Sequence, residues 1–174
     1  MELFCMEVWI MSELKSFEKF VEEGIVVKVK KNIERAKALV IESERKKRSL
    51  KENLEKVGIK NENANDHVED CYDILMYLIR AKLYIEGYKA SGQGAHEAEV
   101  SYLRVLGFNE NDALFMNQLR YFRNGIMYYG TSLDKEYAEK VLKFLNKIYP
   151  KLKQKHLYWK TYLKTTIKRC WILK

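Results

Sequence analysis

The stretch with the most chemical potential is LRYFRNGIMYYG at residues 119–130, an apolar helical segment that holds two arginines and an asparagine. Guanidinium groups stay charged at physiological pH and bind phosphate or carboxylate oxygens through paired hydrogen bonds. On a straight helix at roughly 100° per residue, Arg123 and Tyr128 are about 140° apart, while Arg120 lies beside the apolar face. Arg123, Asn124 and Tyr128 therefore face one pocket only if the helix relaxes there or a second subunit closes the pocket.

Histidine is the residue whose ordinary pKa suits proton transfer at neutral pH, and the chain has three of them. His96 follows SGQGA near an expected helix N-terminus, where an anion is favoured, and Glu97 is adjacent. His96 is therefore a candidate for proton transfer, with a solvated loop histidine or a cap contact as the alternative. His67 at the start of a helix and His156 near the C-terminus are expected to be exposed.

A metal site or a cofactor is not expected. Cys5, Cys71 and Cys170 are far apart and form no C-x-x-C pair, and the histidines are not at ligand spacing. Reduced thiols of this kind indicate a cytoplasmic protein. The longest apolar run, ILMYLI at 74–79, is far shorter than the ~20 residues that a membrane span needs.

The net charge of +8 is confined to the C-terminal segment. Residues 151–174 contain eight basic residues and no acid, which leaves 24 basic and 24 acidic residues in 1–150. The candidate RNA contacts of this basic aromatic segment are Lys160, Lys164, Lys168 and Arg169. The alternatives are contact with a membrane surface, or an apolar stripe that docks on the bundle or on a partner.

The chain as a whole shows helical periodicity, with apolar residues recurring every three or four positions. One proline and eight glycines give few turn signals, and no strand-like alternation is present. We therefore expect an all-α, up-down bundle of five to six helices over residues 12–153, between an extension at 1–11 and a tail at 154–174. The expected helices cover about 12–24, 27–57, 66–89, 95–107, 109–130 and 132–150, with N-caps at Ser12, at Asn109 or Asn111, and at Ser132 or Asp134.

The helix expected at 66–89 is apolar nearly all round, which is typical of a buried central helix. Its exceptions share one face, because they are spaced by three or four residues: Asp73, Tyr77, Arg80, Tyr84 and Tyr88. One interpretation is an internal Asp73–Arg80 ion pair or bonds to other helices. The other is the wall of a groove or a dimer interface.

The segment ESERKKRSLKENLEK at 42–56 carries Glu–Lys and Glu–Arg pairs at i,i+4 spacing, with the glutamate first in each. This pattern favours a solvated helical arm. A nucleic-acid contact by its basic residues is the alternative interpretation.

Two pieces of the chain resemble the HEPN superfamily of helical bundles, in particular its small archaeal members. They are YDILMYLIRAKLYIEGYKASGQGAHEAEVSYLR at 72–104 and LRYFRNGIMYYGTSLDKEYAEKVLKFLNKIYPKLK at 119–153. The family's diagnostic motif is an arginine, often followed by asparagine, with a histidine a few residues later. This chain keeps Arg123 and Asn124 but has Tyr128 in place of the histidine, and a phenol with a pKa of about 10 is a poor base at pH 7.

The resemblance implies a homodimer with a degenerate ribonuclease motif, acting as a binding or interaction module. It also implies a nucleotidyltransferase partner in a toxin–antitoxin-like system. The ligand or nucleotide contacts would be Arg120, Arg123, Asn124, Asp73 and Arg80. The alternatives are a nucleotide-binding protein without turnover, and a metal-independent endoribonuclease in which Arg120 or Arg123 stabilises charge and Tyr128 or His96 moves protons. In a purely architectural interpretation, Arg123 forms an ion pair with Asp73.

Overall fold

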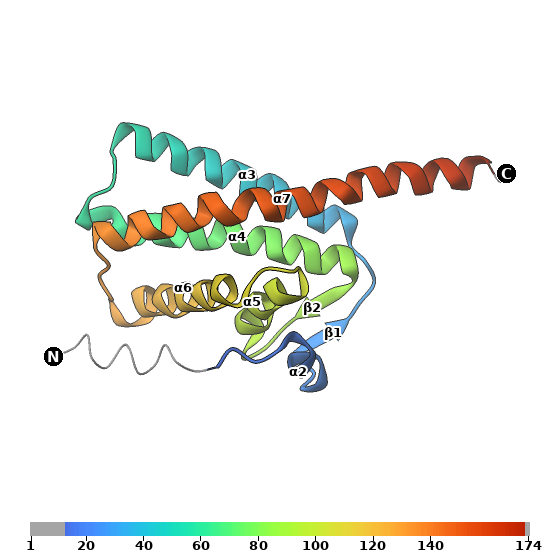
Figure 1. Cartoon of the computed structure of the whole chain (residues 1–174), viewed down its shortest axis with the longest axis horizontal. Helices are drawn as coiled ribbons and strands as arrows, with labels where there is room; N and C mark the ends of the chain where they lie inside the picture. The colour runs from blue at the N-terminus through green and yellow to red at the C-terminus, as the bar shows by residue number, and fades with distance from the viewer. Residues whose placement is uncertain (1–12, 173–174) are drawn as a thin grey trace.

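The computed structural model describes residues 13–172, with the side chains of 127–129 and 156–172 outside the description. Six α-helices and a two-stranded sheet make up this range (Figure 1), which confirms the all-α bundle. In chain order the elements are α2 (Phe17–Glu22), β1 (Val26–Lys28), α3 (Ile33–Lys56), the short 3₁₀ helix η1 (Asn61–Asn63), α4 (Ala64–Glu86), β2 (Tyr88–Ala90), α5 (Ala95–Val105), α6 (Glu110–Tyr129) and α7 (Lys135–Ile172).

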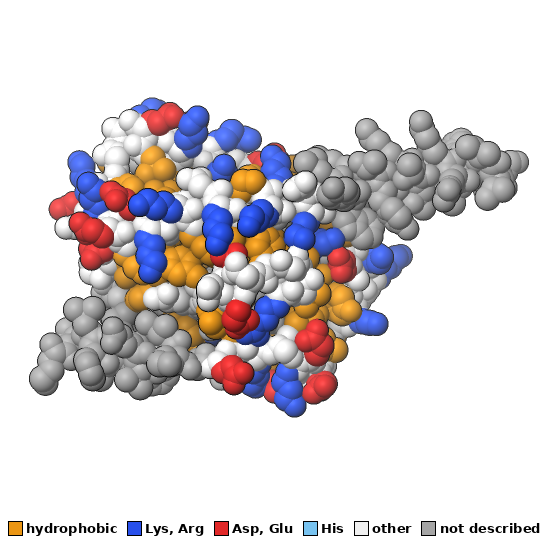
Figure 2. Space-filling model, viewed as in Figure 1, with side chains coloured by type: hydrophobic (Ala, Val, Ile, Leu, Met, Phe, Trp, Pro, Cys, Tyr) orange, Lys and Arg blue, Asp and Glu red, His pale blue; other side chains and the backbone are white. Residues whose placement is uncertain are grey.

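Helix α4 is the centre of the bundle, as its apolar composition predicts. It contacts α3, α5, α6 and α7, and its Leu75, Leu78 and Ile79 side chains are completely buried. In Figure 1, α3 and α7 lie on one side of α4, and α5 and α6 lie on the other. Lys and Arg side chains gather over α3 and α7 on the face seen in Figure 2, with hydrophobic side chains between them.

The small sheet was not expected from the sequence. Strands β1 and β2 pair antiparallel with Val26 opposite Ala90, and α3 starts only at Ile33, so the helix expected from residue 27 was wrong there. Three-residue strands are too short to show a period of two. The left-handed turn at Gly87 lets the chain pass close to β1, because a Cβ atom there would lie 2.8 Å from the carbonyl oxygen of Val29.

The sequence named N-cap candidates for three helices, and the structure confirms two of them. The side chain of Asn109 accepts a hydrogen bond from the Asp112 amide at the start of α6, and Asp134 accepts one from the Tyr137 amide at the start of α7. Helix α2 is capped by Ser16. The expected cap Ser12 lies outside the described residues, but residues 13–16 are not helical, so the helix expected from residue 12 was wrong at its start and begins at Phe17.

Helix α7 continues well past the expected end near Pro150, and it also runs through the expected domain boundary at residue 154. Proline has no amide hydrogen, so the carbonyl group of Asn146 loses its bond within the helix. Buried neighbours on both sides, Ile148 and Leu152, hold the helix against the bundle at this point. The far end of α7 projects beyond the other helices in Figure 1. Among the described helices, none has the length and apolarity to span a bilayer.

Candidate functional site

The candidate site is a group of charged side chains where α4, α5 and α6 meet, which we call the arginine cluster: Arg80, His96, Glu97, Glu99, Arg120 and Arg123. Its centre is the pair formed by Arg80 and Glu99. Arg80 Nε and Nη2 donate to the two carboxylate oxygens of Glu99 over 2.9 and 2.8 Å. The Glu99 side chain is only 10% exposed. Burial works against the charge of Arg80, but the bonds to Glu99 outweigh it and raise the pKa of the guanidinium.

His96 contacts the same guanidinium at the surface end of the cluster. Its Nε2 atom lies 3.1 Å from Arg80 Nη2. Because a guanidinium only donates, Nε2 must accept this hydrogen bond, and the proton of the neutral ring is on Nδ1. The surrounding protein lowers the pKa of His96 by desolvating its charged form, and the charges of Arg80, Arg123 and Arg120 lower it further while Glu99 opposes them. The imidazole is therefore neutral at pH 7.

Arg120 brings a second guanidinium to the cluster from α6. Its Nε donates to Asn117 Oδ1 over 2.9 Å, and its Nη2 lies 3.4 Å from Glu97 Oε2 on α5. The guanidinium carbon is 4.2 Å from the centre of the Tyr121 ring. These contacts hold the Arg120 side chain, which is 11% exposed, toward α5.

Arg123 is the third cation, and its Nε atom is buried without a hydrogen-bond partner among the described residues. The hydroxyl group of Tyr72 on α4 is in the same condition, and Tyr72 is 1% exposed. Burial raises the pKa of Tyr72, and Arg80, Arg120 and Arg123 all lie near enough to oppose the rise. Two polar groups with unmet hydrogen-bonding capacity thus adjoin three positive charges. Buried groups of this kind are costly unless something pairs with them.

Neither ion pair considered for Asp73 forms, whereas the alternative for the polar face of α4, bonds to other helices, is confirmed for Asp73 and Arg80. Asp73 Oδ2 accepts a hydrogen bond of 2.6 Å from Lys46 of α3, and Asp70 lies 3.2 Å from the same ammonium group. Asp73 is therefore bound to α3, and neither Arg80 nor Arg123 forms an ion pair with it. The acid near Arg123 on α4 is Glu69, whose pKa is raised by burial and lowered in part by the Arg123 charge.

The stretch from Asn124 to Tyr129, at the C-terminal end of α6, keeps its helical geometry. Helix α6 runs unbroken through Gly125 to Tyr129 and ends at Gly130, which has a φ of 65°. Because the helix does not relax, the backbone directs residues 123 and 128 to different sides, about 140° apart. The side chain of Tyr128 lies outside the described residues. Asn124 is half-buried beside Arg123.

The remaining predicted residues do not join the cluster. Contrary to expectation, His67 is buried, and its Nε2 lies 3.4 Å from the carbonyl oxygen of Gly58. The side chain of His156 and the candidate RNA contacts Lys160, Lys164, Lys168 and Arg169 lie outside the described residues. Within the part that the structure describes, no group of acidic, histidine and cysteine side chains is arranged to hold a metal ion. Cys71 is buried in the core, and its burial raises the pKa of the thiol.

The sequence thus identified the three arginines and His96, which the structure brings together. It missed Glu99, Tyr72 and Asn117, and Glu97 only appeared as a neighbour of His96. One signal for Glu99 was present, since it lies three residues after His96 and among apolar residues of the same helix.

Comparisons with protein-family models, with curated proteins and with solved structures found no match to this chain.

Proposed function

We propose that this protein is a HEPN-like helical bundle that acts as a binding module for a phosphate-bearing ligand, a nucleotide or RNA, at the arginine cluster. The observation that carries the proposal is the convergence of three guanidinium groups with two unpaired donors, Arg123 Nε and the Tyr72 hydroxyl. A phosphate group has enough acceptor oxygens to pair with such donors and carries the charge that the arginines favour.

The pairing within the cluster supports an anionic ligand. The three arginines are opposed by Glu97, by Glu99 and by Glu69, which lies near Arg123, so the charges balance by count and the support comes from the donors that these carboxylates leave unpaired. Glu99 takes two donors of Arg80, and Glu97 contacts only Arg120. Among the described residues, Arg123 Nε has no partner, which leaves this donor for a ligand.

We further propose that the protein acts as a homodimer, with the resemblance and a line of partly exposed polar side chains on α4 as support. Asp73, Tyr77, Arg80 and Tyr84 lie along one side of the central helix and are only half-buried. A central helix of a bundle is ordinarily covered on all sides, and a second copy placed on this face would bring two arginine clusters toward a common axis. The nucleotidyltransferase partner implied by the resemblance belongs to the same proposal.

A residual endoribonuclease is the second candidate, and the neutral state of His96 favours it. In such a reaction His96 accepts the proton of an RNA 2′-hydroxyl, the 2′-oxygen attacks phosphorus, and the 5′-oxygen leaves with a proton from solvent. The arginines stabilise the charge that develops on the phosphorane oxygens. Arg80 occupies the Nε2 lone pair of His96 and must release it first.

Binding to Arg123→Gln tests the main proposal. Nucleoside monophosphates and a short uridine RNA are titrated into the wild type, Arg123→Gln and a control, Arg35→Gln, which removes an exposed charge from α3. We expect roughly a tenfold loss of affinity for Arg123→Gln and no change for the control. Equal affinity of all three proteins, or no binding by any, would contradict the proposal.

Incubation of the same RNA with wild type and His96→Asn tests the second candidate, the endoribonuclease, which fails if neither protein cleaves the RNA.

A further inference from the structure

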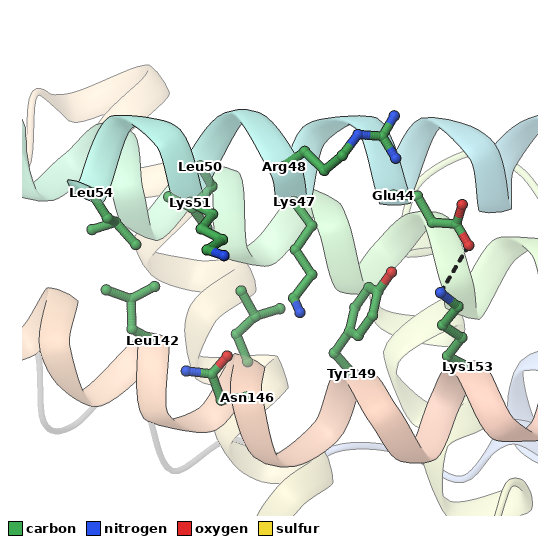
Figure 3. A pocket seen from close by; sticks show the side chains of 11 residues that line it. Glu44, Lys47, Arg48, Leu50, Lys51, Leu54, Leu142, Asn146, Tyr149 and Lys153 are labelled. Carbon is green, nitrogen blue, oxygen red and sulfur yellow. Dashed lines mark ion pairs between the residues drawn. The ribbon is translucent and has the colours of Figure 1, made fainter. Parts of the chain in front are cut away.

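A groove separates α3 from α7 where both helices pack on α4 (Figure 3). Its volume is about 420 Å³. The groove lies on the side of α4 away from α5 and α6, so it is distinct from the arginine cluster (Figure 1). None of the residues that line it belongs to that cluster.

Aliphatic side chains form the floor of the groove. Leu50 and Leu54 come from consecutive turns of α3, and Leu142 and Leu145 come from α7. Leu50 and Leu145 are 2% and 1% exposed, whereas Leu54 and Leu142 are partly exposed at the edges. Leucines at helical spacing on two adjacent helices form the kind of surface against which the apolar face of a third helix packs.

The rim of the groove is strongly basic. Lys47, Arg48 and Lys51 extend from α3, and Lys153 extends from α7 (Figure 3). The one carboxylate in the lining, Glu44, is bound to Lys153 at 3.0 Å. Four cations and one anion leave three net positive charges in the lining. Glu55, outside the lining, lies 3.6 Å from Lys51, but both side chains are more than half exposed, so the contact is weak.

We propose that the groove docks an acidic amphipathic helix of a partner protein. The apolar face of such a helix would cover the exposed parts of Leu54 and Leu142, which the buried Leu50 and Leu145 support from below. Glutamate or aspartate at its flanks would pair with Lys47, Arg48 and Lys51. Complementary charge of this kind directs the approach of the partner and fixes its register. Asn146 at the edge supplies a neutral donor and acceptor for a polar side chain of the partner.

The composition of the groove favours a helix over single-stranded nucleic acid. Sequence-tolerant binding of nucleic acid combines positive charge with aromatic faces on which bases stack. Tyr149 is the aromatic residue in the lining, but it is 6% exposed and its ring is covered by Lys47, whose Nζ lies 4.3 Å from the ring centre. The floor is aliphatic, and the polar sugar–phosphate backbone of a nucleic acid would not pack against it.

Fluorescence anisotropy with a stapled helical peptide tests the proposal. The probe contains three copies of the heptad Glu-Leu-Glu-Glu-Leu-Leu-Glu, which places leucines on one face and glutamates around it. One control peptide has serine in place of leucine, and another has lysine in place of glutamate. The protein is used as the full chain, in three forms: wild type, Lys47→Glu with Lys51→Glu, and Lys56→Glu with Lys60→Glu. The last pair changes the net charge by the same amount outside the groove.

We expect the acidic leucine peptide to bind the wild type, to lose roughly tenfold or more in affinity for the Lys47→Glu/Lys51→Glu protein, and to retain it for the Lys56→Glu/Lys60→Glu protein. Neither control peptide should bind well. The proposal is overturned if the acidic peptide does not bind, if the serine peptide binds equally, or if both charge-reversed proteins lose affinity alike. A short uridine RNA that binds through Lys47 and Lys51 while the peptide does not would assign the groove to nucleic acid. Circular dichroism confirms that both variants are folded.

Discussion

Arg80 of α4 and Glu99 of α5 are joined by two parallel hydrogen bonds of 2.9 and 2.8 Å, and the same guanidinium holds the ring of His96. A single side chain on the central helix therefore fixes both the orientation of α5 and the protonated nitrogen of its histidine. A change at Arg80 should therefore alter both the free energy of unfolding and the pKa of His96.

Replacing Glu99 by glutamine removes the charge that balances Arg80. Because the pair is largely buried, we expect the free energy of unfolding in urea to fall by about 2 kcal/mol. Glu110→Gln is the matched control, since Glu110 also forms two bonds to an arginine, Arg104, but is 55% exposed. That change should cost less than about 1 kcal/mol. Equal losses for the two variants would show that the burial of Glu99 is unimportant.

Because the hydroxyl group of Tyr72 is unpaired among the described residues, the substitution Tyr72→Phe should not destabilise the protein. Removing a buried hydroxyl that has no partner should leave the free energy of unfolding unchanged or raise it by up to about 1 kcal/mol. Tyr102→Phe is the control, because the Tyr102 hydroxyl donates to Glu86 over 2.8 Å. Its loss should lower stability by about 1 kcal/mol. If Tyr72→Phe is the more damaging change in thermal unfolding, the hydroxyl group has a structural partner.

His96 should titrate below its ordinary pKa of 6.5, because desolvation and three arginines disfavour its charged form. Proton NMR of the imidazole Cε1–H signal measures this directly, and His96→Asn assigns the signal by removing it. Replacing Arg80 with methionine should raise the pKa toward 6.5, since one repelling charge is lost. A wild-type value at or above 6.5 would contradict the geometry.

The same titration makes stability depend on pH. Because the folded-state pKa of His96 lies below that of the unfolded chain, the unfolded state binds the proton more readily. Stability should be intact above pH 6.5 and should fall as the pH drops from 6.5 toward the folded-state pKa. Urea unfolding at several pH values measures this, and the slope in that window should be smaller in His96→Asn.

Gly125 should resist substitution by alanine although it lies within a helix. A Cβ atom there would be 2.9 Å from Thr131 Oγ1, because the chain after α6 turns back against the helix. We expect Gly125→Ala to lower the free energy of unfolding by about 1 kcal/mol despite the better helix propensity of alanine. In a Thr131→Ala background the contact is absent, and the same substitution should raise stability by up to about 1 kcal/mol. A loss of the same size in both backgrounds would refute this explanation.

The helices were predictable because their signals are local. The periodicity of 66–89 predicted the buried α4, and Asn109 and Asp134 occupy caps that the sequence named. The strands were missed because pairing between residues 26 and 90 is a contact between distant segments. Pro150 was misleading, since tertiary packing of α7 outweighs the local cost of proline.

The partners of the charged residues were not predictable from spacing. Asp73 and Arg80 share a face of one helix, but their backbones are about 10.5 Å apart along the axis. Carboxylates and ammonium groups on other helices are nearer, so Asp73 pairs with Lys46 and Arg80 with Glu99. The sequence could place Arg80, Arg120, Arg123 and His96 on helices, but only the packing of α4, α5 and α6 places them together.

The two walls of the groove come from helices at opposite ends of the bundle's sequence. Helix α3 is synthesised early, whereas α7 leaves the ribosome only after α4, α5 and α6 have been made. The arginine cluster can assemble from three consecutive helices, but the leucine floor exists only once α7 has closed onto α4. A protein that recognises this groove therefore distinguishes the closed bundle from chains still in the course of translation.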